Sequence, residues 1–145
     1  MGQTGMIHTV RGPVEPGAMG RTLVHEHVFC DFYRITGILN HLLNDEELAV
    51  EELGALVRAG GGALVEVTTP DFGRDPERLR RVAERTGLHI VMGTGWYRQP
   101  YYPELIDRTP TESLAQRMIE ELTQGVDGAE IRAGIIGEIG AHGSF

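Results

Sequence analysis

Short apolar runs alternate with longer stretches in which apolar side chains recur every three or four positions. The short runs predict four β-strands, at 21–29, 63–68, 89–94 and 133–139. The longer stretches have the spacing of amphipathic helices, at 45–59, 75–86 and 109–125. Because strand and helix alternate along the chain, the pattern favours an α/β fold built on a parallel sheet.

Polar residues and glycines mark where the predicted helices begin and end. Asn44 is the predicted N-cap of the first helix, and Asp75 followed by Pro76 is a typical start for the second. Gly60 and Gly87 follow the last turns of these two helices, where glycine commonly ends a helix. The residues predicted to face the core are Leu48, Leu53, Leu56 and Val57 in the first helix, Leu79, Val82 and Ala83 in the second, and Leu114, Met118, Ile119 and Leu122 in the third.

The length of the chain predicts a single domain. A chain of 145 residues can bury a core of its own, so residues 1–145 are expected to form one unit with a short N-terminal arm at about 1–20. Within that arm, residues 10–14 are typical of a short hairpin or an extended segment.

The sharpest chemical signal is the pair His25 and His27 in the first predicted strand. Residues two apart on a strand point to the same face, so both imidazoles can reach one cation, whereas Glu26 would point the other way. Neutral imidazole is a good ligand for zinc and similar metals. The alternative is two histidines that alternate by chance. The strand context weakens it, because buried imidazoles need polar partners.

Glu138 is the second signal, because it follows the apolar run of the fourth predicted strand. A carboxylate buried in such a run is unfavourable unless it is paired or bound to a metal. It would be an ordinary solvated acid if the strand ended before it. If the strands close into a (β/α)8 barrel, their C-terminal ends share one rim, and Glu138 would meet His25 and His27 there.

Three further residues are possible participants with simpler explanations. Glu66 in the second predicted strand would either pair with a neighbour such as Arg21 or orient a metal ligand. Cys30 follows His27 by three residues, but a free cysteine near a core usually acts as a small hydrophobic residue. His142 lies just past the fourth strand and is most simply a loop residue.

The amino-acid composition and net charge disfavour some classes of binding partner. Hydrophobic residues make up 41% and charged residues 23% of the chain, which is typical of a globular protein. The formal net charge of −8 disfavours nucleic acid and anionic membranes as partners, because both require a basic surface. The single cysteine excludes an internal disulfide, and the first residues lack the pattern of a secretory signal. We therefore expect a cytoplasmic protein that acts on a small molecule.

Four segments carry a resemblance to a known family. GRTLVHEH at 20–27, VTTP at 67–70, MGTGWY at 92–97 and IRAGIIGEIG at 131–140 resemble the first four strand ends of the phosphotriesterase family, in the amidohydrolase superfamily. The resemblance extends over residues 10–140. A complete (β/α)8 barrel needs about 250 residues. The implied fold is therefore the N-terminal half of such a TIM barrel, about strands one to four.

The resemblance also implies a centre with two divalent metal ions, with zinc as the first choice and manganese, cobalt or iron as alternatives. His25 and His27 would bind the more buried ion. Glu138 would bridge both ions and the attacking hydroxide, as in the phosphotriesterase homology proteins, whereas the best-known phosphotriesterases have a carboxylated lysine there. The ligands of the second ion and the general base would come from later strands, beyond Phe145.

The implied function is hydrolysis of a lactone, a carboxylic ester or an organophosphate ester by a metal-activated water. The glutamate bridge and Tyr97 favour a lactone or carboxylic ester. Tyr97 and Trp96 would contact the substrate, unless they only cover the rim. The alternative is a truncated, inactive half-barrel that binds metal weakly or serves only for association. Its first and fourth strands would be open edges, which a homodimer would pair.

Overall fold

The computed structural model describes residues 5–99 and 101–140, and its centre is a four-stranded parallel sheet in the order β3-β6-β7-β8. The strands are β3 (Arg21–Glu26), β6 (Gly61–Glu66), β7 (His89–Thr94) and β8 (Ile135–Ile136). This is the predicted α/β arrangement. In register, Leu23 lies opposite Leu64, and Leu64 lies opposite Ile90.

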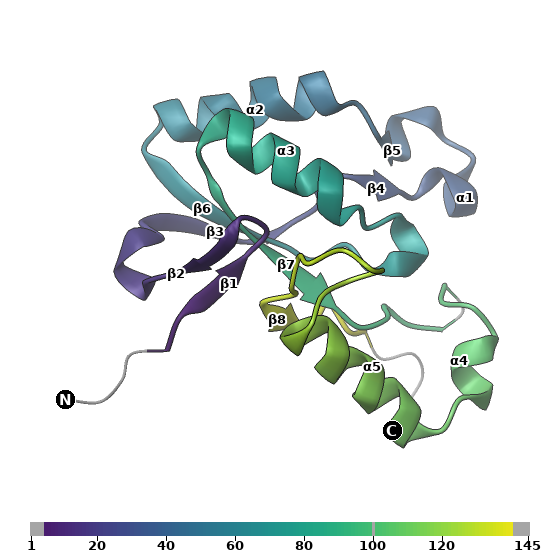
Figure 1. Ribbon diagram of the computed structural model, residues 1–145. Helices are drawn as coiled ribbons and strands as arrows, with labels where there is room; N and C mark the ends of the chain where they lie inside the picture. Colours follow the sequence, from purple (N-terminus) through teal and green to yellow (C-terminus); the bar gives the residue numbers. More distant parts are fainter. Residues whose placement is uncertain (1–4, 100, 141–145) are drawn as a thin grey trace.

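The three predicted helices connect the strands. They are α2 (Glu46–Arg58), α3 (Pro76–Thr86) and α5 (Thr111–Thr123). Figure 1 shows α2 and α3 side by side along the sheet, with α5 next to β8. The shorter elements are η1 (Pro16–Ala18), β4 (Cys30–Asp31), α1 (Tyr33–Thr36), η2 (Leu39–His41), β5 (Leu42–Leu43), η3 (Pro70–Phe72) and α4 (Leu105–Arg108). Within residues 5–99 and 101–140, every helix is too short or too polar to serve as a transmembrane span.

The main core lies between the sheet and α3. Leu64 and Ile90 of the sheet pack with Leu79, Val82 and Ala83, the face of α3 that the sequence predicts. These five side chains are essentially inaccessible to solvent. A smaller apolar cluster is formed by Met19, Ala63 and Val91.

Two predicted features of the first helix are wrong. The N-cap is Asp45 rather than Asn44, because the Asp45 carboxylate accepts a hydrogen bond from the Leu48 amide at 3.0 Å. Leu48 and Val57 are exposed, whereas Leu53 and Leu56 pack on the core as predicted. The rest of the packed face is formed by Ala49 and Val50. The face that contacts α3 and β6 is therefore rotated from the predicted one.

The predicted hairpin near the N-terminus is present and packs on the sheet. β1 (Ile7–Thr9) pairs antiparallel with β2 (Gly12–Val14). The Val10 amide then donates a hydrogen bond to the Ile90 carbonyl at 2.9 Å, and the Val10 side chain is buried. The hairpin therefore belongs to the folded unit, whereas residues 1–4 of the expected arm lie outside the described residues.

The fourth strand is shorter than the predicted segment 133–139. β8 contains only Ile135 and Ile136, although the Gly137 amide still donates to the Thr94 carbonyl at 2.8 Å. A side chain on Gly93 would collide with the Gly137 carbonyl. Glycine at position 93 thus allows β7 and the end of β8 to approach closely, and it places Glu138 just beyond the sheet.

Candidate metal centre

Three side chains from the two ends of the described chain converge at the C-terminal end of the sheet. His25 Nε2 lies 3.2 Å from one carboxylate oxygen of Glu138, and His27 Nε2 lies 3.5 Å from the other. One potential ligand atom from each residue lies within 4.8 Å of the other two. The structure therefore brings together the three residues that the sequence predicts as metal ligands.

The predicted strand 21–29 is too long, because β3 ends at Glu26, so His25 lies in β3 and His27 just past its end. The pairing of β3 with β6 shifts register between Leu23 and Glu26, so the strict alternation predicted for this strand does not run through His25. Both imidazoles nevertheless reach Glu138, with their ring centroids 5.5 Å apart and their planes at 75°. The His25 side chain is 57% exposed and that of His27 is 25% exposed. The site therefore lies at the surface, with His27 on its inner side.

A neighbouring hydroxyl and partial burial both act on the His27 imidazole. Its Nδ1 atom lies 2.9 Å from the hydroxyl oxygen of Thr68, just past the end of β6. Burial lowers the pKa of His27, and the nearby Glu138 carboxylate opposes that shift only in part. The imidazole is therefore mainly neutral at pH 7, which is the form that binds metals.

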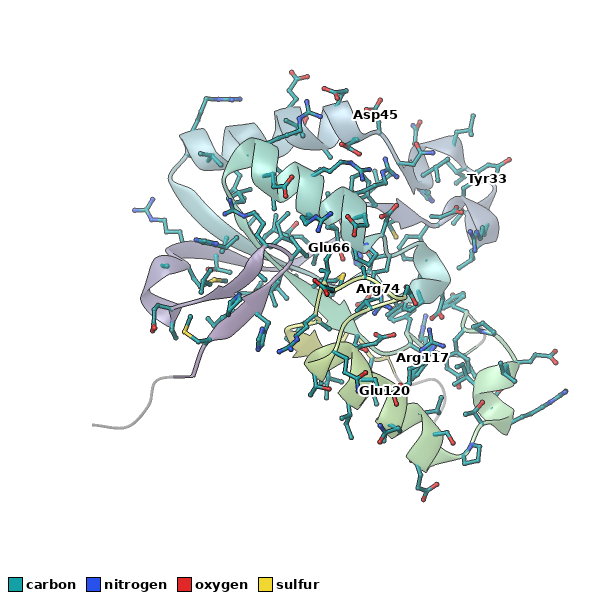
Figure 2. All side chains as sticks on the ribbon, viewed as in Figure 1. Tyr33, Asp45, Glu66, Arg74, Arg117 and Glu120 are labelled. Atoms are coloured by element: carbon teal, nitrogen blue, oxygen red, sulfur yellow. The ribbon has the colours of Figure 1, made fainter. Side chains whose placement is uncertain are left out.

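Glu66 does not pair with Arg21, which the sequence suggested as its partner. Arg21 is exposed, whereas Glu66 is only 1% exposed and lies in the interior of the molecule (Figure 2). The Glu66 carboxylate accepts hydrogen bonds from the Val28 amide at 3.2 Å, from the Thr68 amide at 3.1 Å and from the Thr68 hydroxyl. Burial raises the pKa of Glu66 to about 7, although these hydrogen bonds oppose the shift.

Tyr97 and Trp96 lie in different surroundings, although they are neighbours in sequence. The Tyr97 ring stacks on Tyr101 with centroids 5.9 Å apart, and the Tyr97 carbonyl accepts from the Gly140 amide at 2.7 Å. The backbone of Tyr97 is therefore hydrogen-bonded to the segment that contains Glu138. The Trp96 ring instead lies 5.8 Å from the guanidinium of Arg117 on α5.

Several residues around the site are not predicted by the sequence. The rings of Phe32 and Phe72 are tilted by 34° with their centroids 4.4 Å apart, and Phe32 also meets the His27 ring edge-on at 6.3 Å. Asp71, in η3, accepts a hydrogen bond from the Tyr97 amide at 3.2 Å, and burial raises its pKa. Irregular segments position these side chains, so a strand or helix period carried no signal for them.

The remaining sequence candidates do not join the cluster. Cys30 is buried, and burial raises its pKa to about 12, so the thiol acts as a small apolar side chain. Cys30 is not part of the group of potential ligands found among the described residues. His142 lies outside the described residues.

The donor set suits a divalent transition metal. Two imidazole nitrogens and a carboxylate are ligands that zinc, manganese, cobalt and iron all accept. One of the imidazoles is kept neutral by burial, and the carboxylate lies between both rings. The residues present therefore fit a metal ion of this class.

Comparisons with known proteins show what the whole chain is similar to. The sequence profile of the phosphotriesterase family matches residues 5–144. The N-acetyltaurine hydrolase of Tetraodon nigroviridis is 36% identical, over 94% of this chain and 48% of the relative. The phosphotriesterase homology protein of Escherichia coli, solved with phosphate in its active site, has a TM-score of 0.80 at 32% identity, over 83% of this chain and 42% of that chain. A lactonase from Listeria monocytogenes has a TM-score of 0.82 at 25% identity, over 90% of this chain and 46% of that chain.

The matches cover only part of each relative's length. The chain spans about half the length of the curated relatives it matches. Its four parallel strands correspond to about half of the (β/α)8 barrel of the structural relatives, as the sequence predicts.

Proposed function

The chain belongs to the phosphotriesterase family, and from that premise we propose that it forms the first-metal side of the active centre of a metal-dependent hydrolase. The observation that carries this proposal is the convergence of His25, His27 and Glu138, whose potential ligand atoms lie within 4.8 Å of one another. In barrels of this type the catalytic groups gather at the C-terminal ends of the strands, which is where these three side chains lie.

The three side chains have separate roles in the proposed centre. The Nε2 atoms of His25 and His27 would hold the more buried ion, and Glu138 would bridge it to a second ion. We propose zinc for both positions, with manganese, cobalt or iron as alternatives. Bound divalent ions supply a nucleophile at neutral pH and polarise the bond under attack. The neutral state of His27 supports its role, because a protonated imidazole has no lone pair for a metal.

The proposed substrate is a small acyl compound. The relatives reported above include an N-acetyltaurine hydrolase and a lactonase, whose names both indicate attack at a carbonyl carbon. We therefore propose a lactone, a carboxylic ester or an N-acyl amide, with an organophosphate ester as the alternative. Tyr97 is the proposed substrate contact, because its backbone is hydrogen-bonded to Gly140 beside Glu138. Trp96 has weaker support, because its ring lies over Arg117 of α5.

A second candidate is that the chain alone binds metal but hardly turns over substrate. Among residues 5–99 and 101–140, His25, His27 and Glu138 form the one group of three potential ligands. The proposed second ion and the general base would need further groups. We therefore expect slow hydrolysis of lactones, esters and amides by the zinc-loaded chain. Rapid turnover that disappears with His25→Ala would exclude this candidate and support the hydrolase directly.

Isothermal titration calorimetry of the purified chain with zinc tests the metal site. We expect one tight zinc per chain in the wild type and at least a hundredfold weaker binding in the double variant His25→Ala, His27→Ala. His8→Ala is the matched control, because His8 lies in the β1–β2 hairpin rather than in the cluster. The proposal is wrong if the wild type binds zinc no more tightly than the double variant.

A further inference from the structure

Two residues that are not metal-ligand candidates are connected to His27 by hydrogen bonds. Thr68 Oγ1 lies 2.9 Å from His27 Nδ1 on one side and donates to the Glu66 carboxylate on the other. Both Glu66 and Thr68 are 1% exposed, so water does not compete for these contacts. The connection runs from the interior of the sheet to the imidazole that faces Glu138.

The chemistry of the three groups sets the direction of the hydrogen bonds. At pH 8, above the pKa of about 7 to which burial raises Glu66, its carboxylate is ionised and only accepts hydrogen bonds. Its other partners are the amides of Val28 and Thr68, which donate. The Thr68 hydroxyl therefore donates its single proton to the Glu66 carboxylate. The hydroxyl oxygen can then only accept from His27, so the His27 proton lies on Nδ1. Nε2, which lies 3.5 Å from Glu138, is left with a free lone pair.

Glu66 also fixes the backbone next to the imidazole. The oxygen that accepts from the Thr68 hydroxyl also accepts from the Val28 amide, one residue after His27. The other oxygen accepts from the Thr68 amide. One buried side chain therefore sets both the position of the backbone at His27 and the orientation of its ring.

We propose that Glu66, acting through the Thr68 hydroxyl, is the positioning residue of His27 and holds its imidazole in the Nδ1–H tautomer, with Nε2 directed to the metal position. This inference rests on the proposed function for its purpose, but the tautomer itself is a property of the metal-free protein. Partners of this kind typically change metal affinity by about 10- to 100-fold when they are removed.

The first test is the tautomer of His27 in the metal-free chain at pH 8, read from the ¹⁵N chemical shifts of its ring nitrogens. We expect the wild type to show a protonated Nδ1 and an unprotonated Nε2. Thr68→Val should shift His27 toward the Nε2–H form, because its Nδ1–H loses its acceptor. Thr68→Ser keeps the hydroxyl and should restore the wild-type shifts. Unchanged shifts in Thr68→Val would overturn the proposal.

The second test is zinc affinity. We expect Glu66→Gln and Thr68→Val to bind zinc about 10- to 100-fold more weakly, with Thr68→Ser close to the wild type. Thr36→Val is the matched control, because Thr36 makes the same type of contact, at 3.1 Å, with the exposed His41 outside the cluster. Its zinc affinity should not change. Circular dichroism of each variant verifies that the fold is retained.

The two proposals can fail separately. If zinc binding requires His25 and His27 but is unaffected by Glu66→Gln and Thr68→Val, the positioning role is wrong and the metal site stands. If the wild type binds no zinc, the metal site is wrong, and the ¹⁵N shifts alone decide whether Glu66 and Thr68 set the tautomer.

Discussion

At the scale of single residues, burial acts on two acids with opposite results. Burial raises the pKa of Glu66 to about 7, because its partners are neutral amides and a hydroxyl. Burial also disfavours ionisation of Glu121, yet hydrogen bonds from Arg74 and Thr94 hold the pKa of Glu121 below its usual value. The difference is a direct hydrogen bond from a cation, which Glu121 receives from Arg74, whereas the charge of Arg74 acts on Glu66 without such a bond.

The raised pKa of Glu66 predicts a pH-dependent stability. Between its ordinary value of 4.5 and about 7, the native chain keeps this proton while the unfolded chain has lost it. The unfolded state then binds fewer protons, so the contribution of Glu66 to the free energy of unfolding falls as pH rises through this window and is constant above it. A shift of this size corresponds to about 3 kcal/mol.

Urea unfolding of the wild type and of Glu66→Gln between pH 4.5 and 8 measures this contribution. We expect the wild type to lose stability relative to Glu66→Gln as pH rises to about 7, because glutamine does not titrate. A difference between the two proteins that is independent of pH would contradict the assignment.

Single residues also show how far the sequence could predict the site. The spacing of His25 and His27 and the position of Glu138 after an apolar run predict that they meet only if the strands close into a (β/α)8 barrel, which is the fold that the family resemblance implies. The contact of Thr68 with His27 could not be predicted, because it depends on the side-chain direction at the end of another strand. Glu66 was identified as an interior acid, but its partner was not.

At the scale of elements, a buried ion pair joins η3 to α5. The Arg74 guanidinium, which follows η3, donates to Glu121 of α5 at 2.7 and 3.1 Å and to the Gly93 carbonyl of β7 at 3.0 Å. Both side chains of the pair are almost inaccessible. Figure 2 shows Arg74 beside the sheet, with Arg117 nearby on α5. The pair therefore ties three elements together near the end of β7.

Glu121→Ala should strongly destabilise the chain. It removes the hydrogen-bonded partner of the buried Arg74 charge, for which the cost is about 3–5 kcal/mol. Asp127, whose Oδ2 lies 3.6 Å from Arg74 Nη2, remains as the second acidic neighbour. Glu120→Ala is the matched control on the same helix, because Glu120 is exposed and its side chain accepts a hydrogen bond from Gln116 one turn away. Its effect on the free energy of unfolding, measured in urea, should stay within about 0.5 kcal/mol. Equal losses in both variants would show that the ion pair does not stabilise the fold.

The same pair explains an error in the predicted helix faces. Periodicity placed Ile119 on the buried side of α5, whereas Ile119 is 51% exposed and Glu121 is buried. An apolar pattern cannot reveal a buried acid whose partner is far away in sequence. By contrast, the face of α3 was predicted correctly, because only apolar side chains fill it.

At the scale of the whole molecule, the sheet has two edges that pair on one side only among the described residues. These edges are β3 and β8. Val24 on β3 is 75% exposed, and Ile136 on β8 is also exposed. Exposed apolar side chains beside unpaired backbone groups favour association with another chain, although a net charge of −8 opposes it.

We therefore expect the isolated chain to self-associate with increasing concentration through these edges. Light scattering after size-exclusion chromatography measures the mass directly. Val24→Lys should reduce association, because a charged side chain blocks pairing at an edge strand. Leu105→Lys, at an exposed apolar position on α4, should not. A monomer at all concentrations would refute this expectation.

The position of the three proposed ligands also gives the cation a mechanical role. His25 belongs to the first strand of the sheet and Glu138 follows the last, so one ion would fasten the two outermost strands to each other across the curved sheet. Any ligand that binds only the folded chain stabilises it, by about 2.7 kcal/mol when its concentration is a hundred times the dissociation constant. Saturating zinc would therefore cross-link the two edge strands of the sheet. Removal of zinc by a chelator would increase local unfolding of these edge strands before that of the central strands.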